Sequence, residues 1–406
     1  MARFICIVPP LTGHVNPTLG VGAALLEAGH EVAWISLDES LKDRLPKGAQ
    51  LLLISYTEDD REAQQSLQYL DVITKKVVYG VDSIKFLYEE VLIPLNRHCY
   101  RGISEWLREY KPDLVITDHE LFAGAIAAVQ LGIPYVTSVT APAAIQIMDE
   151  LPKVYEWEQN QIVALQKELG LRAEKSIASS DLLNLVFTSQ EFFGKPKMPE
   201  HYKFVGPVIY KREGTTGFDW QRFHEITDRP RILVSIGTTF NHEHKKAFFE
   251  KVTEAFAEAP VTVVVICEPT LVEQWPENFL VQLNIPQLEV LPYLDAVVCH
   301  GGHNTVCESI SHGKPLVVIP IAYDQSHVAG RVVDTGAGMR LNFNRFKAKH
   351  LREAVYEVLT QPGYSAAAAA LSQSFVAAGG TATAANLLIK AAGSHHEPLL
   401  STHRYV

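Results

Sequence analysis

The feature that most constrains this chain is a repeated alternation of short apolar runs with helical segments, joined by loops rich in glycine and proline. An apolar run at Arg3–Val8 precedes a Pro/Gly loop, a segment with helical apolar spacing that ends at Gly29, and a second apolar run at Glu31–Ile35. The same order returns at Asp113–Thr117 and Pro134–Val139. Such alternation is typical of βαβ units, and it predicts an α/β fold with a parallel sheet.

The second half of the chain repeats this order. A strand is expected at Arg231–Ser235, a helix at Glu243–Ala257 and a strand at Val261–Ile266. Further strands are expected at Leu288–Leu291, Ala296–Cys299 and Pro315–Ile319. In the first half, the first helix is expected to begin at Asn16–Pro17, because asparagine suits the N-cap of a helix and proline suits its first position. The halves therefore predict two Rossmann-like sheets that face each other across a ligand-binding cleft.

The length of 406 residues also favours two domains, because single domains usually span about 100 to 200 residues. Apolar periodicity stops at Lys211–Arg229, where glycine, aspartate and charged residues crowd together. We predict an N-terminal domain at 1–210, a linker at 211–229, a C-terminal domain at 230–385, and a helix with a loose tail at 386–406. Helical apolar segments at 57–110 and 141–178 are expected to wall a cavity in the N-terminal domain.

Charge and composition exclude several classes of partner. The net charge is −10, which disfavours nucleic acid, because binding its phosphate backbone needs clustered Lys and Arg. No apolar stretch approaches 18 residues, so no transmembrane segment is expected. The five cysteines are odd in number and lack CxxC spacing, which fits reduced thiols in the cytoplasm. The oligomeric state cannot be read from the sequence.

The loop His300-Gly301-Gly302-His303-Asn304-Thr305 lies between a predicted strand and a predicted helix. Glycines let the backbone approach a ligand, and the helix N-terminus would direct free N–H groups at an anion. His300 and Thr305 add donors, and Glu308 can accept from ribose hydroxyls, so the set describes a nucleotide site. A plain Gly-rich turn capped by Asn304 is the ordinary alternative. A metal site using Cys299, His300, His303 and Cys307 is a weaker one, since the spacing matches no usual zinc pattern.

Asp324-Gln325 follows the next predicted strand. A carboxylate beside an amide can bind several sugar hydroxyls, although the same residues could simply cap a helix. His14 lies in the loop after the first strand, and Asp118 ends a strand at the same edge of the same sheet. A loop histidine is usually only a surface residue. A carboxylate behind it, however, would fix its tautomer and make it a general base.

Taken together, these residues resemble the glycosyltransferase family that uses UDP- or TDP-sugars and includes macrolide, carotenoid and flavonoid glucosyltransferases. The resemblance covers most of the chain, and its motifs are Gly13-His14-Val15-Asn16-Pro17, Asp113-Leu114-Val115-Ile116-Thr117-Asp118, Ser235-Ile236-Gly237-Thr238, and Pro286-Gln287 through Asp324-Gln325. It implies the GT-B fold, a nucleotide-sugar donor such as UDP-glucose, an apolar small-molecule acceptor, and no cofactor or metal. The reaction it implies is a direct displacement that inverts the anomeric centre.

The resemblance also implies a role for each matching residue. His14 would be the base and Asp118 would orient it, while Thr238, His300, Gly302, Asn304 and Thr305 would surround the diphosphate. Glu308 would hold the ribose, Ile285 and Gln287 would meet the nucleobase, and Asp324 and Gln325 would bind the sugar. Two positions depart from the family pattern: Asn284 stands where relatives carry a stacking Trp, and Val328 where many carry Asn.

Two other functions, and one variant of the transferase itself, are alternatives to this interpretation. A sugar-nucleotide epimerase would turn over the donor alone, and the apolar helical segments and the His14–Asp118 pair would then have no purpose. A protein that only binds a nucleotide sugar would be expected to have lost one member of that pair. A transferase acting on lipid at a membrane surface would want a basic apolar patch, which the acidic composition disfavours. Whether the acceptor is a polyketide, carotenoid, phenolic or sterol cannot be read from the sequence.

Overall fold

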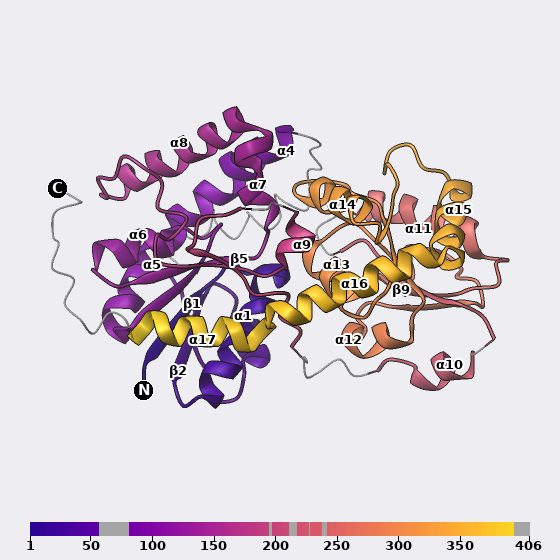
Figure 1. Cartoon of the computed structure of the whole chain (residues 1–406), viewed down its shortest axis with the longest axis horizontal. Coiled ribbons are helices and arrows are strands. Elements are labelled where there is room, and N and C mark those ends of the chain that lie inside the picture. Colours follow the sequence, from indigo (N-terminus) through magenta and orange to yellow (C-terminus); the bar gives the residue numbers. More distant parts are fainter. Residues whose placement is uncertain (57–80, 195–196, 211–216, 227, 238–241, 394–406) are drawn as a thin grey trace.

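The computed structural model describes residues 1–56, 81–194, 197–210, 217–226, 228–237 and 242–393. Two parallel β-sheets lie side by side along the long axis of the molecule, each flanked by helices (Figure 1). We refer to the part of the chain that carries the first sheet as the N-terminal half and to the part that carries the second as the C-terminal half. The structure thus has the α/β architecture expected from the alternation in the sequence.

The first sheet has the strand order β3-β2-β1-β4-β5-β6-β7, with every pairing parallel. Its strands are β1 Arg3–Ile7, β2 Glu31–Ser36, β3 Gln50–Leu53, β4 Leu114–Asp118, β5 Tyr135–Val139, β6 Asn184–Val186 and β7 Tyr202–Phe204. The described helices of this half are α1 Thr12–Glu27, the 3₁₀ turn Glu39–Arg44, α4 Val81–Phe86, the π-helix Leu87–Leu92, α5 Ile93–Tyr110, α6 Ala123–Gln130, α7 Ala143–Glu150, α8 Pro152–Glu168 and α9 Gln190–Phe193.

The second sheet has the order β10-β9-β8-β11-β12-β13, again parallel throughout. Its strands are β8 Arg231–Ser235, β9 Thr262–Ile266, β10 Phe279–Gln282, β11 Ala296–Cys299, β12 Leu316–Val318 and β13 Gly338–Arg340. Its described helices are α10 Trp220–Glu225, α11 His242–Phe256, a 3₁₀ turn Pro269–Leu271, α12 Gln287–Val290, a 3₁₀ turn Leu291–Tyr293, α13 His303–Ser311, α14 Gln325–Asp334, α15 Ala348–Thr360, α16 Pro362–Ala378 and α17 Gly380–Gly393.

Each sheet has an apolar core on both of its faces, which explains the continuous apolar runs in the sequence. In β1, Ile5 and Ile7 pack into one core cluster, while Phe4 and Cys6 pack into the cluster on the opposite face. Successive side chains of a strand point to opposite faces, so a strand covered by helices on both sides must be apolar throughout. Residues on β8 divide between two clusters in the same way.

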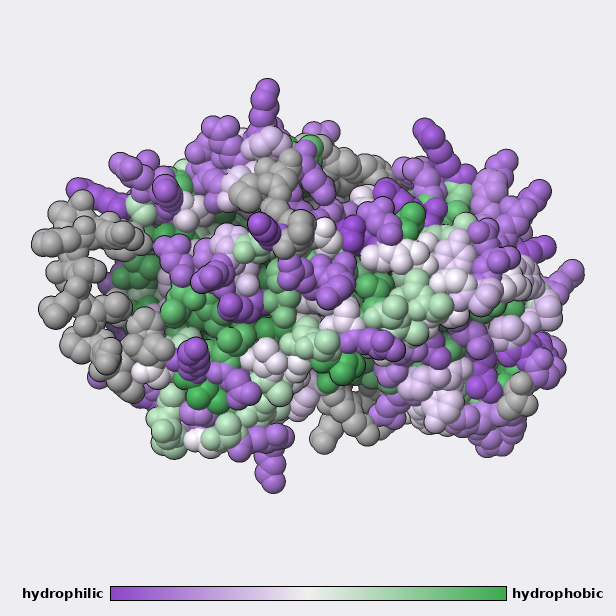
Figure 2. All heavy atoms as spheres, viewed as in Figure 1, coloured by the Kyte–Doolittle hydropathy of each residue, from purple (hydrophilic) through white to green (hydrophobic). Residues whose placement is uncertain are grey.

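The C-terminal helices connect the two halves. Helix α16 packs against α13 of the C-terminal half, and α17 packs against α1 of the N-terminal half. The direction changes at Gly379, whose φ of 91° suits glycine. Figure 1 shows both helices as one yellow path along the molecule, and Figure 2 shows apolar side chains gathered over α17.

We predicted no transmembrane segment. Within the described residues, Pro362–Gly393 is the one helical stretch whose length and composition would allow it to cross a membrane, and this criterion alone is weak evidence. The helix supplies buried residues to both halves, including Phe375 in the C-terminal core and Leu388 in the N-terminal core.

Several boundaries differ from those we predicted. Helix α1 begins at Thr12, so Asn16–Pro17 lies inside the helix and His14 is in its first turn rather than in a loop. The prediction of a strand at Leu288–Leu291 is wrong. Helix α12 and a 3₁₀ turn contain these residues, and the strand of this region is β10 at Phe279–Gln282. Pro286 and Pro292 flank this run, and proline favours the start of a helical turn over a central strand.

The predicted domain limits stay predictions. Of the segment expected to be a linker, the described part contains α10, whose Phe223 is fully buried in a core cluster of the C-terminal half. Helix α17 already begins at Gly380, before the predicted limit at 385. The expected loose tail after residue 393 lies outside the described residues, as does the part of the expected cavity wall at 57–80.

Candidate active site

The two strand orders fix where a ligand can bind. In the first sheet the chain order reverses between β1 and β4, and in the second between β8 and β11. Ligands of such sheets bind beyond the carboxyl ends of the strands at this switch point. A cavity of about 1380 Å³ lies there, lined by residues of both halves. Since single-ligand pockets usually measure about 300 to 1,000 Å³, the cavity has room for two ligands.

His14 and Asp118 meet at the N-terminal wall of this cavity. The His14 Nδ1 lies 3.0 Å from an Asp118 carboxylate oxygen, and Asp118 is fully buried at the end of β4. The Thr140 hydroxyl, just beyond β5, donates to the other oxygen of Asp118 at 2.8 Å and lies 2.8 Å from the same Nδ1. Because Asp118 cannot donate, it favours the tautomer with the proton on Nδ1 and leaves Nε2 able to accept one.

A second imidazole and a second carboxylate extend this pair. The His119 ring stacks on the His14 ring with centroids 5.9 Å apart, and its Nδ1 lies 3.3 Å from Asp118. On the opposite edge, the Glu120 carboxylate lies 3.5 Å from His14 Nε2 and 3.9 Å from His119 Nε2. Two imidazoles therefore lie between two carboxylates.

This arrangement decides the charge of His14. Burial disfavours the charged imidazole, but the Asp118 and Glu120 carboxylates outweigh burial and raise the pKa of His14 to about 9. Burial also opposes ionisation of Asp118, yet the two histidines hold the pKa of Asp118 well below its usual range. His14 therefore favours the protonated, imidazolium form at neutral pH.

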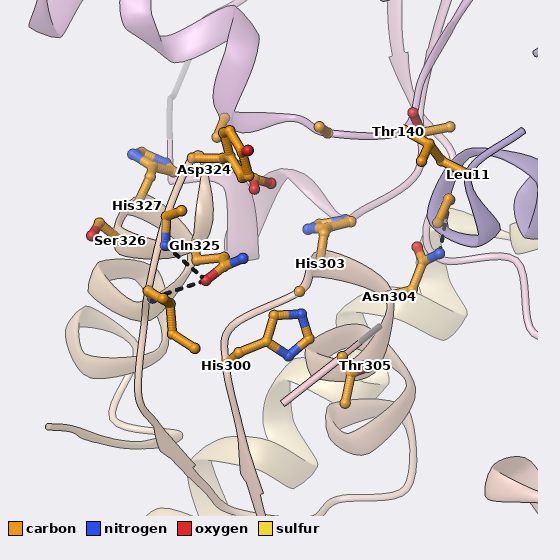
Figure 3. A pocket seen from close by; sticks show the side chains of 18 of the residues that line it. Leu11, Thr140, His300, His303, Asn304, Thr305, Asp324, Gln325, Ser326 and His327 are labelled. Atoms are coloured by element: carbon orange, nitrogen blue, oxygen red, sulfur yellow. Dashed lines mark hydrogen bonds between the residues drawn. The ribbon is translucent and has the colours of Figure 1, made fainter. Parts of the chain in front are cut away.

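The C-terminal wall is built around the start of α13. Gly302 is the N-cap and forms no side-chain cap, so Asn304 is not the capping residue. The first N–H groups of a helix have no partner within it, and residues 302–305 line the cavity. Figure 3 shows Asn304 and Thr305 at this helix start, with Leu11 and Thr140 of the N-terminal half across the cavity. The helix dipole makes this wall a site for an anion.

His300 fills the space beside this helix start. A Cβ on Gly302 would lie 2.6 Å from His300 Nε2, and one on Gly237 would lie 2.9 Å from it. A side chain at either position would therefore collide with the His300 ring, and glycine leaves room for it. Burial lowers the pKa of His300 to about 4, so the ring is neutral at pH 7 and can offer hydrogen bonds but no charge.

Gln287 and Glu308 lie together at one end of the cavity. The Gln287 amide donates to a Glu308 carboxylate oxygen at 2.6 Å, and Glu308 is 5% exposed. Asn284 and Ile285 line the cavity beside them. The residues expected to meet the nucleobase and the ribose are thus neighbours, and Asn284 supplies no aromatic face for stacking.

Asp324 and Gln325 begin α14 on the same wall. The Asp324 side chain makes no capping bond. Burial and the nearby Glu120 raise the pKa of Asp324 to about 6. Gln325 accepts from the backbone N–H of Ile321 and Ala322 at 2.9 and 3.1 Å (Figure 3). Its oxygen therefore holds the loop in place, while the residue lines the cavity.

Asn304 links the two walls. Its side-chain amide donates to the Gly13 carbonyl at 2.8 Å, directly beside His14. The structure therefore brings Asn304 to the N-terminal half as well as to the helix start. Thr238, expected at the diphosphate, lies outside the described residues.

The alternative metal site is not assembled. Among the described residues, the metal-type cluster that forms is His14, Asp118 and His119, with ligand atoms within 4.8 Å of one another, and it omits the four residues of that alternative. Burial raises the pKa of Cys299 to about 12 and that of Cys307 still further, so both remain thiols.

Three residues of the site escaped the sequence analysis: Thr140, His119 and Glu120. Thr140 follows a strand adjacent to β4, and that position is the signal by which it could have been found, because parallel strands end at a common edge. His119 and Glu120 follow Asp118 directly in sequence, and only the turn after β4 folds them back onto His14.

The facing sheets and the shared cavity define the class. The structure matches the calicheamicin glycosyltransferase CalG4 with a TM-score of 0.73 and 24% identity, over 98% of this chain and 100% of that one. It also matches glycosyltransferase VinC, solved in complex with DTDP, with a TM-score of 0.70 and 20% identity, over 97% and 100% of the chains. The fold is GT-B.

Sequence comparison gives the family. The sequence model of the family described as UDP-glucoronosyl and UDP-glucosyl transferase matches residues 135–375. The uncharacterized UDP-glucosyltransferase YojK of Bacillus subtilis (strain 168) is 30% identical over 96% of this chain and 98% of its own length. The chain belongs to the UDP-glucoronosyl and UDP-glucosyl transferase family, and it is a glycosyltransferase. The resemblance and the fold predicted from the sequence are thereby confirmed.

Proposed function

We propose that this glycosyltransferase moves a sugar, in the first instance glucose from UDP-glucose, onto a hydroxyl of an apolar small molecule, with inversion and without a metal ion. The observation that carries the proposal is that His14, backed by Asp118 and Thr140, faces the N-terminus of α13 across one cavity. The DTDP complex of VinC supports a nucleoside diphosphate donor here, the description of CalG4 as the calicheamicin glycosyltransferase supports a natural-product acceptor, and the apolar residues of the N-terminal wall support an apolar one.

The chemistry follows from the two walls. His14 Nε2 accepts the proton of the acceptor hydroxyl, and the oxygen forms a bond to the anomeric carbon from the N-terminal side. The bond from that carbon to the diphosphate breaks, and its electron pair leaves with the nucleotide. The α13 N–H groups meet the charge that develops on the leaving oxygen, which is electrostatic stabilisation without a cation. Attack opposite the leaving group turns an α-linked donor into a β-glycoside.

The remaining roles complete the proposal. His300, Gly302, Asn304, Thr305 and Thr238 surround the diphosphate, Glu308 binds the ribose, Ile285 and Gln287 meet the base, and Asp324 with the Gln325 amide binds the sugar. With no stacking Trp at 284, a TDP-sugar remains a second candidate donor. We also propose that the enzyme works in the cytoplasm.

Mass spectrometry tests this proposal directly. The reaction contains UDP-glucose, a panel of apolar hydroxylated acceptors and EDTA, with a TDP-sugar in a parallel reaction. The expected result is an acceptor heavier by one hexose. A strict need for added metal would contradict the metal-free mechanism. Conversion of the donor without any acceptor would instead favour an epimerase.

A further inference from the structure

One carboxyl group in the cavity has no place in the mechanism above. Glu158 projects from α8 (Pro152–Glu168) into the cavity and is only 6% exposed. In the described part of the chain, no hydrogen bond or ion pair satisfies it. A buried carboxyl without a partner is costly as an anion, and burial together with the Glu120 charge raises the pKa of Glu158 to about 8.

The charges around Glu158 leave it without a counter-ion. His14 and His119 together balance Asp118 and Glu120, with which they are in contact. The residues of the N-terminal half that are described and line the cavity include no Lys or Arg. Glu158 therefore has only the partial compensation that the charge of His119 provides, and a cationic ligand bound beside it would favour the ionised carboxylate over the neutral acid.

The surroundings of Glu158 suit an ammonium group attached to an apolar body. Tyr88, on the π-helix Leu87–Leu92, lines the same part of the cavity, and the charge of Glu158 contributes to a raised pKa of Tyr88, after burial. Aromatic faces attract cations when water is excluded. Leu87, Leu92 and Ile147 supply apolar contact nearby. π-Helical turns are rare, and they occur frequently at functional sites.

We propose that the acceptor carries a protonated amine, which binds between the Glu158 carboxylate and the Tyr88 ring while the acceptor hydroxyl is presented to His14. The inference rests on the proposed function, because it takes the N-terminal wall to be the acceptor side. It narrows the acceptor from any apolar alcohol or phenol to the class of hydroxylated hydrophobic amines.

Binding without donor gives the first test. Calorimetric titration compares tyramine with N-acetyltyramine, which keeps the phenol and the ring but carries no charge. We expect the wild-type protein to bind tyramine roughly tenfold or more tightly than the acetylated compound, and Glu158→Gln to abolish that preference. Glu156→Gln, an exposed change two residues away on α8, should leave it intact. Equal affinity in the wild-type protein, or a preference retained in Glu158→Gln, would overturn the proposal.

A transfer experiment shows whether Glu158 binds an amine of the acceptor or an amine of the donor sugar. With UDP-glucose as donor, kcat/KM for the two phenols should show the same preference. If the preference for an amine appears only on comparing UDP-glucosamine with UDP-N-acetylglucosamine, Glu158 serves the donor sugar and the assignment to the acceptor is wrong. Amine binding with no hexose transfer to any acceptor would refute the proposed function while leaving the amine site standing.

Discussion

At the scale of single residues, the proposed mechanism depends on the contact between His14 and Asp118. We expect His14→Ala to lower kcat by about a hundredfold or more, because the acceptor hydroxyl then has no base, and Asp118→Asn to lower it strongly too. UDP affinity, measured by calorimetry, should stay unchanged, since the nucleotide wall belongs to the other half. Near-normal turnover of His14→Ala would remove it from the mechanism.

The charge of His14 makes the reaction depend on pH. A base acts in its unprotonated form, and the Asp118 and Glu120 carboxylates, which outweigh burial, raise the pKa of His14 to about 9. Below that pH the competent fraction falls about tenfold per pH unit, so kcat/KM should rise with pH and level off near pH 9. Steady-state rates between pH 6 and pH 10 check this expectation.

Glu120 contributes to that pKa from the Nε2 side. Glu120→Gln removes one of the two carboxylates, so the pKa of His14 should fall. The rise of kcat/KM with pH should then occur at lower pH, and the reaction at pH 7 should be faster. Glu109→Gln, an exposed change on α5, is the matched control. An unchanged dependence of kcat/KM on pH would mean that Glu120 does not set the protonation of His14.

The residues of the candidate site could be predicted only in part from the sequence. His14, Asp118, Glu308 and Gln287 stand in motifs with a physical reason for their residue types. The structure brings His14, Glu308 and Gln287 to the cavity and buries Asp118 behind His14. Glu158 was not predictable, because a glutamate on a polar helix carries no sign of burial until α8 is packed. The hydrogen bond from Asn304 to Gly13 was hidden for a similar reason, since it depends on how closely the two halves approach.

At the scale of elements, the β11–α13 turn depends on glycine for room rather than only for flexibility. A methyl group at Gly302 would lie 2.6 Å from His300 Nε2 and would have to displace the ring. We expect Gly302→Ala to weaken UDP binding by about 1 to 3 kcal/mol, which is roughly fivefold to 150-fold, through loss of hydrogen bonds at the helix start. Gly363→Ala, where nothing lies within 4 Å of the added atom, should bind UDP normally.

Elements were predicted best where their length or pattern was unambiguous. Ala296–Cys299 and Arg231–Ser235 are strands as expected, because a short run of branched apolar residues after a polar turn suits a buried parallel strand. The run Leu288–Leu291 has similar composition but is helical. Periodicity cannot separate a short buried helix from a strand, and the flanking prolines were the better indicator.

At the scale of the whole molecule, stability depends on the packing of α17 against α1. Leu388 of α17 is fully buried in the core cluster that contains Val15 and Leu19 of α1. We expect Leu388→Ala to lower the free energy of unfolding by about 2 to 5 kcal/mol, the usual cost of a cavity in a core. Val376→Ala, at a position 78% exposed, should change it little. Urea unfolding followed by circular dichroism measures both.

The pairing of α17 with α1 also sets an order of events during synthesis. The first sheet leaves the ribosome early, but the helix that covers its α1 face is made more than 150 residues after the last strand of that sheet. Until α17 emerges, Val15 and Leu19 lack part of their apolar cover. The nascent N-terminal half is therefore incomplete until the whole C-terminal half and α17 have been synthesised, and only then does α1, which carries His14, have its complete support.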